Sequence, residues 1–295
     1  MRLLSYTVGS EPGFGLVSAD GDGVIALRSR IDGVEDLGAL LDEGRWDAAR
    51  ELADLDADHP WSALTVEVPV RRPGKIFCIG VNYGGRSAEY SDPTDAAYPS
   101  VFVRFVDSFT GHGQALLRPP ESEQLDYEGE IVAVIGRAGR RIPVDQARSH
   151  LAGLTLGNEG TIRDWVRHAK FNVTQGKNWE RSGAIGPWMV SMDEVPDLTT
   201  LHLTTRVNGE VRQDDTTATM KYPIDYLIHY LSTFTALHPG DLVFTGTPTG
   251  AGARSDPPVW LRPDDVVEVS VPEIGTLRNT VADEPTTAIA APEPR

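Results

Sequence analysis

The stretch Leu125-Asp-Tyr-Glu-Gly-Glu-Ile-Val-Ala-Val-Ile-Gly136 decides how this chain is expected to fold. Side chains alternate between the two faces of a strand, so Glu128 and Glu130 share one face. Beyond them apolar residues occupy both faces, which is typical of a strand buried on both sides. Two carboxylates at the head of such a strand need a compensating charge, because burying an unpaired charge is very costly. A divalent cation is one such partner.

A third carboxylate follows in the segment Gly157-Asn-Glu-Gly-Thr-Ile-Arg-Asp164, at Glu159. Three glutamates offer hard oxygen ligands only, a set that suits Mg²⁺ or Mn²⁺ with water in the remaining positions. A second interpretation stays open, because Glu-x-Glu is also typical of the solvent-exposed face of an edge strand. From the residues alone, a buried acid pair and a solvent-exposed strand face are about equally well supported as interpretations of Glu-x-Glu.

The composition is that of a globular protein and argues against some partners. Of the 295 residues 40% are hydrophobic, and 43 Asp and Glu against 27 Lys and Arg give a formal net charge of −16. Nucleic acids and anionic membranes bind basic patches, so neither is an expected partner. The first ten residues lack the apolar core of a signal peptide, and no apolar run approaches the roughly 20 residues of a membrane helix. We expect a cytoplasmic protein, in which the single cysteine, Cys78, is buried.

Two parts with different patterns are expected along the chain. Residues 1–70 combine short strand-like runs with two helical patterns, which predicts a small α+β N-terminal domain. Residues 71–283 contain many short strands and few helices, which are expected over 144–151 and, most clearly, over 222–237. This pattern favours a β-barrel or rolled sheet over alternating βαβ units. Residues 284–295, rich in Ala, Pro and Glu, are expected to form a disordered tail.

Common signatures of other enzyme classes are missing from the sequence. It contains neither the Gly-x-Ser-x-Gly elbow of serine hydrolases nor the His-Glu-x-x-His motif of zinc proteases. The seven histidines are scattered without the spacing of zinc ligands. The glutamates therefore remain the main candidates for chemistry.

Residues 73 to about 283 resemble the catalytic domain of the fumarylacetoacetate hydrolase family, which includes acylpyruvases, oxaloacetate decarboxylases and 2-hydroxyhepta-2,4-diene-1,7-dioate isomerases. The family pattern is Glu-x-Glu followed by a third acid 29 residues later, and Glu159 stands 29 residues after Glu130. Further matching blocks are 78–83, 157–164, 176–179, 186–187, 207–213 and 239–248. The resemblance implies a mixed, mostly β fold of the barrel or roll type, and a homodimer.

The resemblance also implies a role for each candidate site residue. Glu128, Glu130 and Glu159 would bind Mg²⁺, with Mn²⁺ as the alternative, although the third position is commonly Asp in the family. Lys177 would stand beside the metal. The implied substrate-binding residues are Tyr83, Arg104, Arg163, Gln213, Gly246 and Thr247.

Two departures from the family pattern concern the general base. Hydrolytic members often read Asn-Tyr-x-x-His-x-x-Glu, and here Arg86 stands at the histidine position while Glu89 keeps the acid. Arginine stays protonated and cannot act as an ordinary base. In addition, Val166 replaces a glutamine that is common in the family. His112, in Gly-His-Gly, is the other candidate base.

The implied activity is metal-assisted chemistry on a small 2-oxo or 1,3-diketo carboxylic acid, through an enolate. With a water activated by Glu89, His112 or the metal, the expected outcome is hydrolytic C–C cleavage of an acylpyruvate-type substrate. Without such a water, the same site suits isomerisation (tautomerisation) or decarboxylation of a hydroxymuconate- or oxaloacetate-like acid. A metal-binding protein without catalysis is the third alternative.

Overall fold

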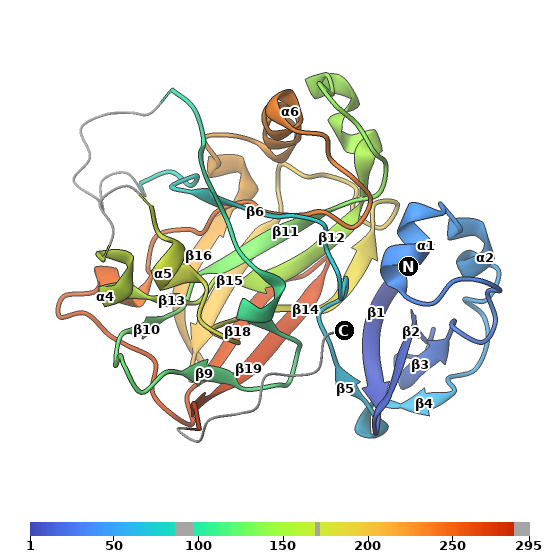
Figure 1. The fold of residues 1–295 in the computed structure, drawn as a ribbon, viewed down its shortest axis with the longest axis horizontal. Coiled ribbons are helices and arrows are strands. Elements are labelled where there is room, and N and C mark those ends of the chain that lie inside the picture. Colours follow the sequence, from blue (N-terminus) through green and yellow to red (C-terminus); the bar gives the residue numbers. More distant parts are fainter. Residues whose placement is uncertain (86–96, 169–171, 286–295) are drawn as a thin grey trace.

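The computed structural model describes residues 1–85, 97–168 and 172–285. The chain folds into a mostly β structure in which the N-terminal elements lie beside the larger remaining part (Figure 1). The N-terminal elements are β1 (Arg2–Val8), β2 (Glu11–Val17), β3 (Gly23–Ala26), α1 (Leu37–Asp42), α2 (Trp46–Arg50), β4 (His59–Pro60), η1 (Trp61–Ala63) and β5 (Thr65–Val66).

The larger part contains fourteen strands and a few short helices within the described residues. Its strands are β6 (Ile76–Gly80), β7 (Ser100–Val103), β8 (Phe109–Thr110), β9 (Leu116–Arg118), β10 (Leu125–Asp126), β11 (Gly129–Ile135), β12 (Leu151–Asn158), β13 (Thr161–Ile162), β14 (Gly183–Ser191), β15 (His202–Val207), β16 (Glu210–Thr216), β17 (Leu242–Phe244), β18 (Val266–Val271) and β19 (Gly275–Asp283). Its helices are α4 (Arg163–Val166), α5 (Thr174–Lys177) and α6 (Ile224–Phe234), with 3₁₀ turns η2 (Val106–Ser108), η3 (Val144–His150), η4 (Thr217–Thr219) and η5 (Gly252–Arg254).

Two sheets dominate the described part of the chain. The larger has twelve strands and follows the order β4-β3-β2-β1-β14-β12-β11-β17-β6-β7, with β5 attached to β1 and β8 to β14. The smaller follows β16-β15-β18-β19-β9, and β10 pairs separately with β13. Neither sheet closes on itself over these residues, so the expected mostly β fold is confirmed while the barrel is not.

Strand β11 is buried along its whole length between β12 and β17. Ile131 packs into the core that contains Val269 of the smaller sheet. Val132, on the opposite face, packs in the core that contains Phe244 and residues of the N-terminal strands. The prediction of a strand buried on both sides is confirmed, and the edge-strand interpretation of Glu-x-Glu is wrong.

The N-terminal strands extend the larger sheet. β1 pairs antiparallel with β14, with Leu3 opposite Met189, and both side chains belong to one buried core. The expected boundary near residue 70 falls between β5 and β6, yet this core includes residues from both sides of it. An independently folding N-terminal domain therefore stays a prediction.

The helices differ from the sequence expectation mainly in type and length. The clearest predicted helix is present as α6, which begins directly after Pro223. The helix expected over 144–151 is the 3₁₀ helix η3, which follows the extended Pro143 and buries only Ala147 and His150. A helix that buries so little has only a weak tertiary reason to adopt the α form. Of the helices in the described ranges, none has the length and apolar character to cross a bilayer.

Candidate functional site

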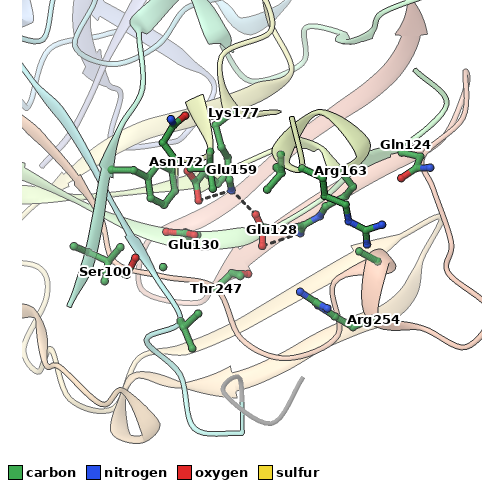
Figure 2. A pocket seen from close by; sticks show the side chains of 18 of the residues that line it. Ser100, Gln124, Glu128, Glu130, Glu159, Arg163, Asn172, Lys177, Thr247 and Arg254 are labelled. Carbon is green, nitrogen blue, oxygen red and sulfur yellow. Dashed lines mark hydrogen bonds and ion pairs between the residues drawn. The ribbon is translucent and has the colours of Figure 1, made fainter. Parts of the chain in front are cut away.

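A pocket of about 830 Å³ opens where β11 begins and β12 ends. Glu128, Glu130 and Glu159 line it together with Lys177, the last residue of α5 (Figure 2). In the antiparallel pairing Glu130 lies opposite Gly157, and the backbone N–H of Glu159 donates to the carbonyl of Glu128 at 2.7 Å. This register is the reason that acids 29 residues apart in the sequence meet in one pocket.

Lys177 is the cation that lies between two of the acids. Its Nζ lies 2.6 Å from Oε2 of Glu128 and 3.0 Å from Oε2 of Glu159. The same nitrogen lies 5.2 Å from the centre of the Phe102 ring. Burial by itself lowers the pKa of Lys177, but Glu128 and Glu159 raise it, and the net pKa is above the ordinary value. Lys177 therefore stays protonated at neutral pH.

Glu130 is held on the other side of the cluster by a backbone donor. Its Oε2 accepts the N–H of Gly246 at 2.7 Å. Burial, together with the charges of Glu159 and Glu128, raises the pKa of Glu130 well above its ordinary range. Gly246 has φ of 102°, and a Cβ there would lie 2.7 Å from the Cβ of Asn82. Glycine is thus the residue that can present its N–H at this point.

Arg163 lies between two carboxylates at the edge of the pocket. Its guanidinium approaches Oε1 of Glu128 at 2.8 Å, and its Nε donates to Oδ2 of Asp126 at 2.7 Å. The carboxylate of Asp126 is fully buried and also accepts the N–H groups of Gly252 and Ala253, at 2.8 and 3.1 Å. Asp126 was not among the residues predicted from the sequence, although it stands two residues before Glu128 and continues the same alternation.

Gln213 is not among the described residues that line the pocket, but it hydrogen-bonds to Gly129 and Thr247 beside it. Its Oε1 accepts the N–H of Gly129 at 2.9 Å, and its Nε2 donates to the Oγ1 of Thr247 at 2.8 Å. Thr247 itself lines the pocket. A Cβ at Gly129 would lie 2.0 Å from Oγ1 of Thr205, so the glycine of Glu-Gly-Glu is required by packing. Gln213 thus links the acidic strand to Thr247.

Two other predicted substrate-binding residues are buried behind the pocket. The guanidinium of Arg104 donates to the carbonyl of Gly160 at 3.0 Å and lies 4.1 Å from the ring centre of Phe109. Tyr83 is buried as well, and burial followed by the charge of Glu130 raises the pKa of its hydroxyl. Within the described structure neither residue is part of the pocket lining. Arg104 instead braces the turn that carries the third acid.

Of the candidate bases Glu89 and His112, only His112 lies within the described residues. Nδ1 of His112 accepts the backbone N–H of Arg278 at 3.1 Å, and burial lowers the pKa of His112. His112 is not among the described residues that line the pocket. Arg86 and Glu89 both lie outside the described residues, in the interval 86–96.

The acids fit a divalent cation by their chemistry. All three are buried, and Oε1 of Glu159 has no hydrogen-bond partner among the described residues. Buried carboxylate oxygens that lack donors are suitable ligands for a hard cation. In their present positions, however, no three Asp, Glu, His or Cys side chains in the described ranges form a ready-made metal-binding group. Lys177 and Arg163 contact the oxygens instead.

The pocket also has cationic residues that sequence analysis did not single out. Arg167 and Arg254 line it, and Figure 2 shows the Arg254 side chain extending toward Thr247. Neither arginine lies in a recognisable motif, so no sequence signal was available for them.

The chain matches the sequence model described as "Fumarylacetoacetate (FAA) hydrolase C-terminal" over residues 75–282. It is also 34% identical over 293 residues to oxaloacetate tautomerase FAHD2A, mitochondrial, of Bos taurus, a match that covers 95% of this chain and 91% of that protein.

Two solved structures have a similar fold. The fumarylacetoacetate hydrolase of the psychrophile Exiguobacterium antarcticum is 28% identical with a TM-score of 0.84, covering 96% of this chain and 100% of that one. The maleylpyruvate hydrolase of Sphingobium sp. SYK-6, solved with manganese(II) and pyruvate, has a TM-score of 0.80, covering 97% and 100%. At 22% identity the second likeness concerns the fold alone.

Proposed function

Because the chain belongs to the fumarylacetoacetate hydrolase family, we propose that it is a divalent-metal-dependent enzyme that converts small 2-oxo acids through an enolate. The observation that carries the proposal is the convergence of Glu128, Glu130, Glu159 and Lys177 in one pocket. Three buried acids beside one protonated lysine suit chemistry in which negative charge develops on a substrate oxygen.

Glu128, Glu130 and Glu159 would hold the ion, which we propose is Mg²⁺ with Mn²⁺ as the alternative, and a bound ion would supply Lewis-acid stabilisation of an oxyanion. Lys177 would donate a hydrogen bond to the same substrate oxygen, since the charges around it keep it protonated. Thr247, oriented by Gln213, would bind a carboxylate or carbonyl oxygen of the substrate. Arg163 would position Glu128 through their ion pair.

Keto–enol tautomerisation or isomerisation is the outcome we place first. It requires a proton to leave the carbon next to the carbonyl and a proton to reach the oxygen, without an activated water. The tautomerase of Bos taurus, which is similar over almost the whole chain, supports this choice.

Hydrolytic C–C cleavage, which the sequence led us to expect, is the second candidate. The similar hydrolase of Exiguobacterium antarcticum favours it. Decarboxylation and metal binding without catalysis complete the alternatives.

The test is incubation of the protein with Mg²⁺ or Mn²⁺ and with oxaloacetate or an acylpyruvate. Enol absorbance is followed and the products are identified by chromatography. Enol loss with an intact carbon skeleton supports tautomerisation, pyruvate plus a second acid supports hydrolysis, and CO₂ release supports decarboxylation. A protein that binds metal but converts none of these acids would favour the non-catalytic alternative. A Glu130→Gln variant with unchanged Mg²⁺ affinity would refute the assignment of the metal ligands.

We further propose a homodimer in the cytoplasm. Large hydrophobic side chains are exposed on neighbouring elements, with Val103 on β7 and Phe234 on α6 both next to Phe77. Light scattering should give a molecular mass of twice the 32.1 kDa of one chain, and Phe234→Glu should lower the measured mass. The relative of Bos taurus is named as mitochondrial, so fractionation of cells is the check on location.

A further inference from the structure

We propose that Arg104 is a positioning residue that sets the spacing between Lys177 and Glu159, by binding the two chain segments that follow them. The inference rests on the proposed function, in which Glu159 is a metal ligand and Lys177 donates to the substrate oxygen. It adds the residue that holds these two groups relative to each other. Arg104 is not among the described residues that line the pocket, so it would act through them and not on the substrate.

The segments that carry Glu159 and Lys177 also meet away from these side chains. Gly160 lies between β12 and β13, and Ser182 lies between α5 and β14. A Cβ at Gly160 would lie 1.8 Å from the carbonyl oxygen of Ser182, so only glycine allows this approach. In the pocket, Nζ of Lys177 lies 3.0 Å from Oε2 of Glu159 (Figure 2). A shift of one segment against the other would therefore change the distance between the lysine and the acid.

The guanidinium of Arg104 bridges the two segments where they meet. One of its terminal nitrogens donates to the carbonyl of Gly160 at 3.0 Å, and the other donates to Oγ of Ser182 at 3.1 Å. The Ser182 hydroxyl in turn donates to the carbonyl of Trp179 at 2.9 Å, two residues after Lys177. Because the guanidinium is planar and its donors form a rigid fork, the two segments are held at a set separation.

Arg104 is itself held in one orientation. Its Nε donates to Oγ of Ser108 at 3.1 Å, and a terminal nitrogen donates to the Ser108 carbonyl at 3.3 Å. The guanidinium carbon lies 4.1 Å from the centre of the Phe109 ring, and only 3% of Arg104 is exposed. A side chain whose rotamer is fixed by packing and hydrogen bonds can hold functional groups in a precise geometry.

The charge of Arg104 connects it to the acids of the pocket. Its hydrogen-bond partners in the described part of the chain are all uncharged, although a buried charge normally has an opposite charge as partner. Burial lowers the pKa of Arg104, and the charge of Glu159 is the largest effect that opposes burial. Arginine stays protonated even so. The acids of the pocket are therefore the counter-charge of Arg104, and Glu159 is foremost among them.

The experiment removes the two contacts of Arg104 separately and together. Ser182→Ala removes the contact on the Lys177 side and leaves the contact to Gly160. Ser232→Ala is the matched control, because Ser232 is equally buried and its hydroxyl also donates to the carbonyl three residues earlier at 2.9 Å, in α6. Arg104→Met removes both contacts and the charge, and Arg104→Lys keeps the charge without the fork.

Three quantities are measured for the wild type and each variant. Mg²⁺ affinity is measured by calorimetry. The values of kcat and KM are measured at saturating Mg²⁺ with oxaloacetate or an acylpyruvate, whichever the wild type converts. Thermal unfolding verifies that each variant is folded and gives its loss of stability. A change in kcat without a change in metal affinity distinguishes misplacement of Lys177 from a general loss of stability.

We expect Ser182→Ala to lower kcat about tenfold, the effect of one lost hydrogen bond, while KM and Mg²⁺ affinity change less than about threefold. Ser232→Ala should lower the melting temperature comparably and leave kcat unchanged. Arg104→Met should lower kcat about a hundredfold, as a misplaced catalytic group does, and Arg104→Lys should lie between it and the wild type.

Equal kcat values for Ser182→Ala and Ser232→Ala would overturn the positioning role and leave the proposed function intact. A parallel fall of Mg²⁺ affinity and kcat in Ser182→Ala would overturn it as well, because loss of the metal would then account for the effect. If Arg104→Met does not fold, Ser182→Ala still decides. A wild type that binds no Mg²⁺ or converts neither acid would refute the proposed function together with the inference.

Discussion

Replacing Lys177 with methionine tests whether one ammonium group compensates the buried acids. Glu128 and Glu159 are 4% and 3% exposed in their side chains, and Lys177 contacts both. Removing one partner of a buried ion pair costs about 3–5 kcal/mol. Arg163 still contacts Glu128 in the variant, so we expect the lower end, about 3 kcal/mol. For 295 residues, with an unfolding entropy of about 2.1 cal/mol/K per residue, such a loss lowers the melting temperature by roughly 5 °C.

The measurement is thermal unfolding at neutral pH in a chelator and again in Mg²⁺. Without metal the variant should melt below the wild type by the interval given above, and Mg²⁺ should recover most of the difference, because a divalent cation would neutralise the same carboxylates. Lys75→Met is the matched control, since Lys75 lies 2.9 Å from the buried carboxylate of Asp241, outside the pocket. The lower melting temperature of Lys75→Met relative to the wild type should persist in Mg²⁺. A metal-free Lys177→Met protein as stable as the wild type would refute the reasoning.

Three further predictions concern other parts of the structure. Asp126→Asn should lower kcat/KM about tenfold or more through loss of charge-assisted hydrogen bonds, and an unchanged value in steady-state kinetics would contradict its positioning role. Arg30 lowers the pKa of Asp58, so the stability from this pair is present above the ordinary pKa of 3.8 and is lost as pH falls through the lower folded value. Urea unfolding should show Asp58→Asn less stable than wild type at neutral pH, with the difference shrinking as pH falls below 3.8, whereas a difference that stays constant with falling pH would contradict this assignment. Gly246→Ala should destabilise by about 1–3 kcal/mol through backbone strain and a clash, measured against Gly9→Ala, where nothing lies within 4 Å of the added carbon; equal effects would show that packing at Gly246 is unimportant.

The acidic strand could be predicted because its signal is local. Apolar residues on both faces of 131–135 require burial on both sides, and β11 is buried in that way. That Glu159 lies close to Glu130 could be predicted only with the family spacing, because a single sequence does not reveal the antiparallel register of β11 and β12. Asp126 was readable from the same alternation, which extends one step further toward the N-terminus than the Glu-x-Glu pair.

Other features depend on contacts between distant segments and could not be read from local patterns. Arg254 belongs to the pocket only because Gly252 and Ala253 donate to Asp126, 126 and 127 residues away. The continuation of the sheet from β14 to β1 is likewise a long-range pairing. The expected barrel was not confirmed, because whether a sheet closes depends on the pairing of its edge strands and not on the number of strands.

The hydrogen bond from Gly246 to Glu130 has a consequence for synthesis of the protein. A ribosome makes Glu130 long before Gly246, so this buried acid waits for its backbone donor until more than a hundred further residues have been added. The nascent chain must keep the acidic segment hydrated during that interval, because sealing it early would bury an unsatisfied carboxylate. Completion of the pocket is therefore a late event of biosynthesis, and a chain released before Gly246 would lack the backbone donor of Glu130.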